Sequence, residues 1–253
     1  MADDQDSAAP RDDGSPLTRP GFLVAAVLVL VIVMLGAFLA VRVARSDNTT
    51  PTPPPATSTV PQNSPTAATS TPADSGASVC GLPEGTKASL TSAPAVTWDY
   101  QGTIAYPQSP EFGPGKVAPE GYRYCYQQGA AGALVMAANA FAQGSDPQVG
   151  DQWVQYALGD GQYREQLLSR LGTSRGSEGT RVKMAGFRIL NYDGQRARVD
   201  IGVQASSQNQ TLTASSVYEL VWQDGDWKIN ADVERPLDVA TIPDLAGYIP
   251  WGE

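Results

Sequence analysis

The chain of 253 residues contains no histidine and only two cysteines. The absence of histidine excludes serine triads and cysteine–histidine dyads of the usual kind, and zinc sites that need imidazole. Two cysteines are too few for an all-thiolate zinc site or a four-thiolate iron–sulfur cluster. The formal net charge of −9 argues against a general nucleic-acid binder, whose affinity depends on neutralising phosphates.

A long apolar run follows the acidic residues 1–20, which have nothing to bury and are expected to be disordered in the cytoplasm. Residues 21–41 carry no charged side chain, and a helix rising about 1.5 Å per residue crosses the hydrocarbon layer over this length. We therefore predict one transmembrane helix over residues 21–43. A cleaved signal peptide is the alternative, but this run is longer than a usual signal-peptide core.

Two arginines lie on each side of the apolar run, so the count of positive charges does not set the orientation of the predicted helix. The residues that follow the run set it instead. The linker, residues 44–79, is rich in Pro, Thr and Ser, and from residue 46 onward it has seven prolines and neither Lys nor Arg. Such a composition favours a semi-extended spacer that holds a domain away from a membrane. A cytosolic linker is the alternative. We place the N-terminus in the cytoplasm and residues 46–253 outside it.

The two cysteines, Cys80 and Cys125, flank a Gly- and Pro-rich segment at the end of the linker. In an extracytoplasmic chain, two thiols most simply form one disulfide. We predict that this disulfide closes residues 80–128, a part of the ectodomain expected to be irregular. Two unrelated buried thiols are the alternative interpretation.

Residues 129–234 are predicted to form three helices and then four strands. Apolar residues recur at three- and four-residue spacing over residues 129–143, 148–158 and 160–171. From Val182 onward the apolar period is two, which predicts strands joined by short turns and hence an antiparallel sheet. The markers of this sheet are a phase change at Ala185–Gly186, turn signals at Asp193-Gly194 and Asp224-Gly225, and a last strand from Trp227 to Val233. The expected fold class is α+β, with helices covering one concave face of the sheet.

This arrangement, with YELVWQDGDWKI at residues 218–229, resembles the cone-shaped fold named after nuclear transport factor two. With an N-terminal membrane anchor it is most similar to the scaffold family of conjugative type IV secretion, including the TcpC-like proteins of Gram-positive bacteria. WDYQGTIAYPQSPEFGP (98–114), GYRYCYQQGAAGAL (121–134) and the closing GYIPWGE resemble a family of actinobacterial membrane-anchored proteins. The resemblance covers residues 80–253 and implies a cone-shaped domain with a scaffold role in DNA transfer.

Candidate acid–base groups are few. Enzymes with a cone-shaped fold place an Asp base and Tyr or Asp donors inside the cone. Tyr218 and Trp222 lie on the apolar face of their strand, where aromatic core packing is expected. Asp200 and Glu219 lie on the polar faces of their strands, and we expect both to be solvated.

Two further features near the C-terminus are the aspartates around the last predicted turn and the tail that follows them. Asp224, Asp226 and Asp232 lie near that turn, where turn geometry alone explains the Asp-Gly pair, so they are not taken as a metal site. The tail, residues 235–253, is interrupted by three prolines and will not form a long helix. We expect it to lie back across the domain and cover a groove. An interaction arm with exposed aromatics is the alternative.

The sequence therefore predicts a non-enzymatic, single-pass membrane protein that serves as a structural or adaptor subunit of a conjugative DNA-transfer machine in the cell envelope. No catalytic residue, cofactor or metal is predicted, and direct nucleic-acid binding is not expected. The expected partners are other subunits of the machine and further copies of the chain, since Gly36 and Ala40 have a spacing found at interfaces of membrane helices. The alternatives are an accessory protein of an actinobacterial lipid importer, or a ligand-binding module that uses the cone cavity.

The predicted orientation is testable with a topology reporter. A reporter that is active only outside the cytoplasm, fused after Glu253, is expected to be active in cells, whereas the same reporter at the N-terminus is expected to be silent. Activity from the N-terminal fusion alone would reverse the orientation.

Overall fold

The computed structural model describes residues 78–170, 181–207 and 210–253. The predicted cytoplasmic segment, the transmembrane helix and nearly all of the linker lie outside the described residues, as does the end of the third predicted helix. Among the described helices, none has the length and apolarity that a membrane span requires.

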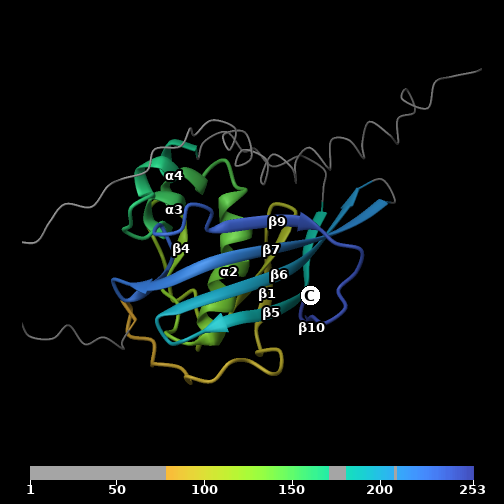
Figure 1. Cartoon of the computed structure of the whole chain (residues 1–253), viewed down its shortest axis with the longest axis horizontal. Helices are drawn as coiled ribbons and strands as arrows, with labels where there is room; N and C mark the ends of the chain where they lie inside the picture. The colour runs from red at the N-terminus through yellow and green to blue at the C-terminus, as the bar shows by residue number, and fades with distance from the viewer. Residues whose placement is uncertain (1–77, 171–180, 208–209) are drawn as a thin grey trace, which may run out of the picture.

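The described residues form an α+β domain in which a few helices pack against a curled, mostly antiparallel sheet with the shape of a half-barrel (Figure 1). The elements are β1 (Thr97–Gln101), β2 (Ile104–Gln108), β3 (Lys116–Val117), β4 (Arg123–Tyr124), α2 (Ala130–Gly144), α3 (Gly150–Ala157), α4 (Arg164–Arg170), β5 (Arg181–Tyr192), β6 (Arg196–Ser207), β7 (Gln210–Gln223), β8 (Asp226–Ile229), β9 (Leu237–Thr241) and β10 (Ile249–Pro250). The predicted α+β class is confirmed, as is the order of helices before the strands β5 to β8 within residues 129–234, whereas the strands β1 to β4 before the helices were not predicted.

Strand order in the main sheet is β1-β2-β5-β6-β7-β8, with β9 also pairing with β7 and β10 with β5. Every pairing is antiparallel except one, the contact of β2 with β5 at Ile104 and Val182. The register between β5 and β6 shifts between Met184 and Gly186, so the bulge expected from the phase change in the sequence is confirmed. Bulges bend a strand and increase its twist, which helps this sheet to curl.

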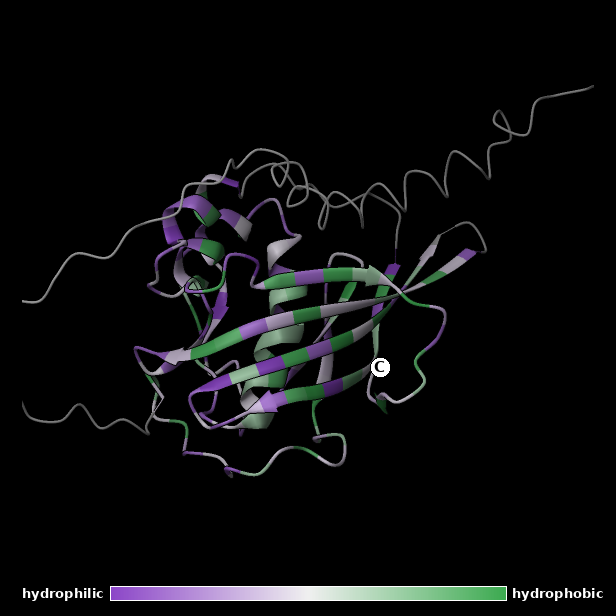
Figure 2. Ribbon diagram, in the orientation of Figure 1, coloured by the Kyte–Doolittle hydropathy of each residue, from purple (hydrophilic) through white to green (hydrophobic). Residues whose placement is uncertain are grey.

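Helix α2 fills the concave side of the sheet and forms the centre of the core. Its residues from Ala130 to Ala140 are all buried, and many of them are alanines, which let the helix lie close to the strands. Figure 2 shows the alternation of hydrophilic and hydrophobic residues along the strands in front of this helix. The largest completely buried apolar side chains are those of Leu134, Met136, Met184, Phe187, Ile201, Leu220 and Trp227.

The disulfide-closed segment, residues 80–128, is more regular than its Gly- and Pro-rich composition indicates. Strands β1 and β2 pair over five residues each, and β3 pairs with β4. Both pairs are local hairpins: β1 and β2 join at a turn where Gly102 has a positive φ of 61°, and β3 and β4 join within the Gly- and Pro-rich stretch, so its glycines and prolines form turns between short strands. The Cys80–Cys125 disulfide is present, as predicted, with the two Cα atoms 6.1 Å apart.

The last predicted strand is shorter than expected. Strand β8 ends at Ile229, whereas the sequence pattern continues through Ala231 to Val233. The main chain at Ala231 instead accepts a hydrogen bond from the Tyr163 amide, before α4, so the connection between the helices takes the place of a sheet partner.

The tail lies back across the domain, which confirms that interpretation over a free interaction arm. Strand β9 pairs with β7, and β10 pairs with β5. Trp251 is 6 % exposed and its ring makes edge contacts with Trp98 and Phe187. Gly186 and Gly202 face each other in the register of β5 and β6, and a Cβ atom on Gly202 would overlap the Leu245 side chain. The paired glycines thus make room for the tail.

The solvated position expected for Asp200 is wrong. Its side chain is fully buried under the tail, where it accepts hydrogen bonds from Ser215 Oγ (2.7 Å), Tyr248 Oη (2.7 Å) and the Arg188 guanidinium (Nε, 3.0 Å). Its alternation pattern is that of an outward-facing residue, but the tail covers that face. Glu219, by contrast, is partly exposed and pairs with Arg198 at 2.8 Å.

A matched pair of substitutions tests this difference. Asp200→Asn is expected to lower the free energy of unfolding by about 1–3 kcal/mol, because it removes the charge that pairs with Arg188 and leaves buried donors without an acceptor. Glu219→Gln, which weakens a partly exposed ion pair, is expected to cost no more than about 1 kcal/mol. Urea unfolding of both variants measures the two values, and equal losses would contradict this assignment.

Candidate functional site

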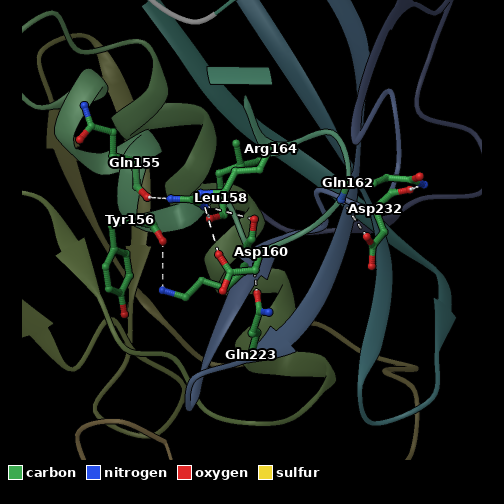
Figure 3. A network of polar contacts seen from close by, with 10 residues as sticks. Gln155, Tyr156, Leu158, Asp160, Gln162, Arg164, Gln223 and Asp232 are labelled. Atoms are coloured by element: carbon green, nitrogen blue, oxygen red, sulfur yellow. Dashed lines mark hydrogen bonds and ion pairs between the residues drawn. The ribbon is translucent and has the colours of Figure 1, made fainter. Parts of the chain in front are cut away.

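A cavity of about 370 Å³ opens where three parts of the chain meet: the N-terminal entry of the domain, the connection between α3 and α4, and the β7–β8 hairpin. Its lining includes Tyr124, Tyr156, Arg164, Gln223 and Lys228. We call it the hairpin pocket. Figure 3 shows the polar contacts around it. It is the strongest candidate for a binding site in the part of the chain that the structure describes.

The β7–β8 hairpin forms one rim of the hairpin pocket. Asp224 and Gly225 both have positive φ, 55° and 72°, the conformation that the predicted Asp-Gly turn requires. The Gly225 carbonyl oxygen accepts a hydrogen bond of 2.7 Å from the Val79 amide. The chain therefore enters the folded domain at the edge of the pocket.

The carboxylate of Asp226 lies beneath the pocket and is fully buried. It accepts hydrogen bonds of 2.8 Å from the amides of Cys125 and Tyr126 and from the Tyr156 hydroxyl. Burial raises the pKa of this carboxyl, while the hydrogen bonds and the charge of Lys228 oppose the rise. The group joins the disulfide segment, α3 and the hairpin.

Lys228 is 5 % exposed and reaches the pocket from the strand β8. Its Nζ atom donates to the Tyr156 carbonyl oxygen at 3.0 Å and lies 3.2 Å from the centroid of the Tyr156 ring. Burial lowers the pKa of this amine to about 8, against the opposing effect of Asp226 and Asp224. The same burial, together with Asp226, raises the pKa of the Tyr156 hydroxyl.

Arg164 fixes the side of the hairpin pocket that is formed by the end of α3 and the α3–α4 connection. Its guanidinium donates to three main-chain carbonyl oxygens, those of Gln155 (2.8 Å), Gly159 (3.1 Å) and Leu158, at the end of α3 (Figure 3). These are the carbonyls that a helix end leaves without partners, so Arg164 caps α3. The adjacent Asp160 amide donates to Gln223 Oε1 at 2.8 Å, which links the α3–α4 connection to β7.

An aromatic cluster adjoins the pocket. The Tyr156 ring lies 5.4 Å from the Tyr122 ring and 5.1 Å from the Tyr124 ring, between centroids. All three side chains are partly buried. Such contacts hold the tyrosines in one orientation and give the pocket an apolar side next to its polar groups.

Of the other candidate residues, Asp224 lines this pocket and Asp226 bonds to its Tyr156, while the rest lie apart from it. Tyr218 and Trp222 are buried in the core, as their alternation predicts. Of the three aspartates near the last turn, Asp226 is buried as described, while Asp232 accepts a hydrogen bond from the Gln162 amide (Figure 3). In residues 78–170, 181–207 and 210–253, no three acidic or cysteine side chains gather as a metal site would require.

Sequence reasoning missed Asp226, Lys228 and Arg164 as parts of one site. In β8 the order Asp-Trp-Lys predicts a strand with a buried aromatic residue between two polar residues that face outward. The covering partners of Asp226 and Lys228 lie 70 to 101 residues earlier in the chain, at Cys125, Tyr126 and Tyr156. No local signal in the sequence indicates that burial.

The comparison with known families gives one match. A family model described as "Domain of unknown function (DUF8175)" matches residues 59–250, which is more than half of the chain. Searches of the curated proteins and of the solved structures found no match.

The lowered pKa of Lys228 predicts a pH-dependent stability. Between pH 8 and about 10.5 the unfolded chain binds the proton that the folded chain has lost, so the free energy of unfolding is expected to rise with pH. From pH 7.5 to 9.5 the rise is about 1–2 kcal/mol relative to Lys228→Met. Urea unfolding across this range measures it, below the pH at which tyrosines titrate. Parallel curves for the two proteins would contradict the assignment, and Lys183→Met, an exposed lysine on β5, is the matched control.

Proposed function

The chain belongs to the family described as a domain of unknown function (DUF8175), and from its own residues we propose that it is a non-enzymatic, single-pass membrane protein acting as an adaptor subunit of a cell-envelope machine. The proposed machine is one of conjugative DNA transfer. The N-terminus lies in the cytoplasm and the folded domain outside it. The partners are other subunits and further copies of the chain.

The observation that carries this proposal is the Cys80–Cys125 disulfide at the point where the linker meets the folded domain. Disulfides persist in oxidising compartments outside the cytoplasm, and this one closes a segment that starts three residues into the described chain. The preceding residues are the Pro-, Thr- and Ser-rich linker and, before it, the apolar run 21–41. A subunit held at a distance from a membrane needs these three parts: a membrane anchor, a spacer and a folded domain, here one stabilised by a disulfide.

The resemblance to conjugation scaffold proteins supports a more specific assignment of the fold and a role in DNA transfer. We infer that the curled sheet and its helices correspond to the cone-shaped fold named after nuclear transport factor two. The supporting features are the order of the helices α2 to α4 before the strands β5 to β8, the bulged β5 and the covering of one sheet face by α2. The TcpC-like similarity supports an adaptor role in DNA transfer.

The contacts of the buried ionisable groups support a role without catalysis. Asp226 accepts main-chain amides, Lys228 donates to a main-chain carbonyl, and Arg164 caps a helix. Groups that are engaged in this way hold segments of the chain together. An acid–base catalyst needs a group within reach of a substrate proton and free to exchange it.

A comparison in cells tests the proposal. The measured quantity is DNA-transfer frequency, with the deletion strain and the unmodified chain as references. The anchored chain with Tyr218→Phe or Glu219→Gln, which remove the candidate donor and acid–base group, is expected to keep full transfer. The unmutated ectodomain secreted without residues 21–41 is expected to fall to the level of the deletion strain. An active anchorless form beside inactive point variants would show an enzyme or a carrier instead.

A further inference from the structure

We propose that the hairpin pocket binds an uncharged saccharide. The carboxylates of Asp160 and Asp224, the Gln223 amide and the Lys228 ammonium hold the hydroxyl groups of the sugar, and Tyr124 contacts its ring. The cavity of about 370 Å³ falls within the range of about 300–1,000 Å³ that is typical of small-molecule sites. The proposal does not depend on the adaptor role or on the membrane anchor.

The charges in the pocket argue for an uncharged ligand. Two cations, Lys228 and Arg164, line the cavity together with the two carboxylates of Asp160 and Asp224, and the carboxylate of Asp226 lies beneath. A simple anion would meet the field of these carboxylates, and a simple cation would meet the two basic groups. Neither sign of charge is favoured, whereas a neutral polar molecule pays no such penalty.

The hydrogen-bonding groups of the pocket suit a molecule with many hydroxyls. Of the three N–H groups on Lys228 Nζ, the hydrogen bonds of the described residues engage one, to the Tyr156 carbonyl. The Gln223 oxygen accepts from the Asp160 amide, which leaves the two N–H groups of Nε2 as donors in the lining. The carboxylates of Asp160 and Asp224 lie at the rim as acceptors; one oxygen of Asp160 is 4.0 Å from Arg164 Nε, and the side chain is still 81 % exposed. A sugar hydroxyl both donates and accepts, so it can bond to either kind of group.

The tyrosine lining supplies the second element of sugar recognition. Tyr124 and Tyr156 both line the pocket, and their rings are held in an edge-to-face contact. The Tyr156 ring is already in contact with the Lys228 ammonium and with the Tyr122 ring. The Tyr124 ring also contacts the Tyr122 ring, at 6.1 Å between centroids, but no cation of the described residues lies over it, so Tyr124 is the aromatic contact for the apolar C–H face of a sugar ring.

The frame of the pocket is set before any ligand binds. Arg164 fixes the end of α3, the Asp160 amide is tied to Gln223, and the hairpin turn is bonded to Val79. A site that is already ordered loses little conformational entropy on binding. Weak polar contacts to a saccharide can then produce measurable affinity.

The test is a titration of the full-length chain with maltose and N,N′-diacetylchitobiose, in a buffer whose detergent carries no sugar headgroup. Calorimetry and saturation-transfer NMR are expected to show saturable binding of at least one disaccharide, with a dissociation constant of about 1 mM or lower. Acetate serves as the probe for an anionic ligand and methylammonium as the probe for a cationic one, and neither is expected to bind.

The matched variants remove the rim carboxylates without changing shape. Asp160→Asn with Asp224→Asn is expected to weaken saccharide binding by about tenfold or more, since asparagine also tolerates the positive φ of residue 224. Asp238→Asn, an exposed carboxylate on β9, is the control and is expected to bind as the unmodified chain does. Thermal unfolding checks that all three proteins remain folded.

Three outcomes would overturn the proposal. They are the absence of saturable binding for both disaccharides, unchanged affinity in the double variant, and binding of acetate or methylammonium in place of the sugars. The adaptor proposal is measured by DNA transfer and by removal of the anchor, so its failure is distinguishable from a failure of sugar binding in solution.

Discussion

The buried carboxylate of Asp226 is the contact on which the arrangement of this domain depends. It joins the main chain after Cys125, the α3 helix through Tyr156, and the β8 strand on which it lies. Removing one partner of such a group leaves the others buried without compensation, at a cost of several kcal/mol. The disulfide, the helix α3 and the hairpin pocket are therefore held in place by one side chain with a raised pKa.

The curled sheet is closed on both faces by different means. On the concave face, the alanine-rich helix α2 lies close to the strands because its side chains are small. On the outer face, the tail crosses at the paired glycines Gly186 and Gly202 and places Tyr248 against Asp200 and Arg188. On both faces, small residues at the contact allow the two segments to approach closely: alanines on α2, and glycines on β5 and β6. The difference is that the outer cover buries a charged group, Asp200, whereas the inner one buries mainly alanines and other apolar side chains.

Much of the fold was accessible from the sequence because it depends on local pattern. The spacing of Leu134, Ala137 and Phe141 predicts α2, and the turn at Asp193-Gly194 and the phase change before Gly186 predict the meander and its bulge. The candidate site was not accessible. Asp226 and Lys228 have the alternation of exposed residues, and their burial depends on partners that are 70 to 101 residues away. Asp200 was misassigned for the same reason, since the tail that covers it follows 48 residues later.

The bond between the Val79 amide and the Gly225 carbonyl has a mechanical consequence. Tension applied through the linker first loads this hydrogen bond and those of Ser78 with Gly81 and Leu82, and then reaches Cys80, whose sulfur is covalently joined to Cys125. From there the load passes to the residues directly before α2, so it bypasses the 44 residues enclosed by the crosslink. A pull on the tether therefore cannot unravel β1 and β2 one residue at a time, and the domain resists peeling from the end at which it is attached.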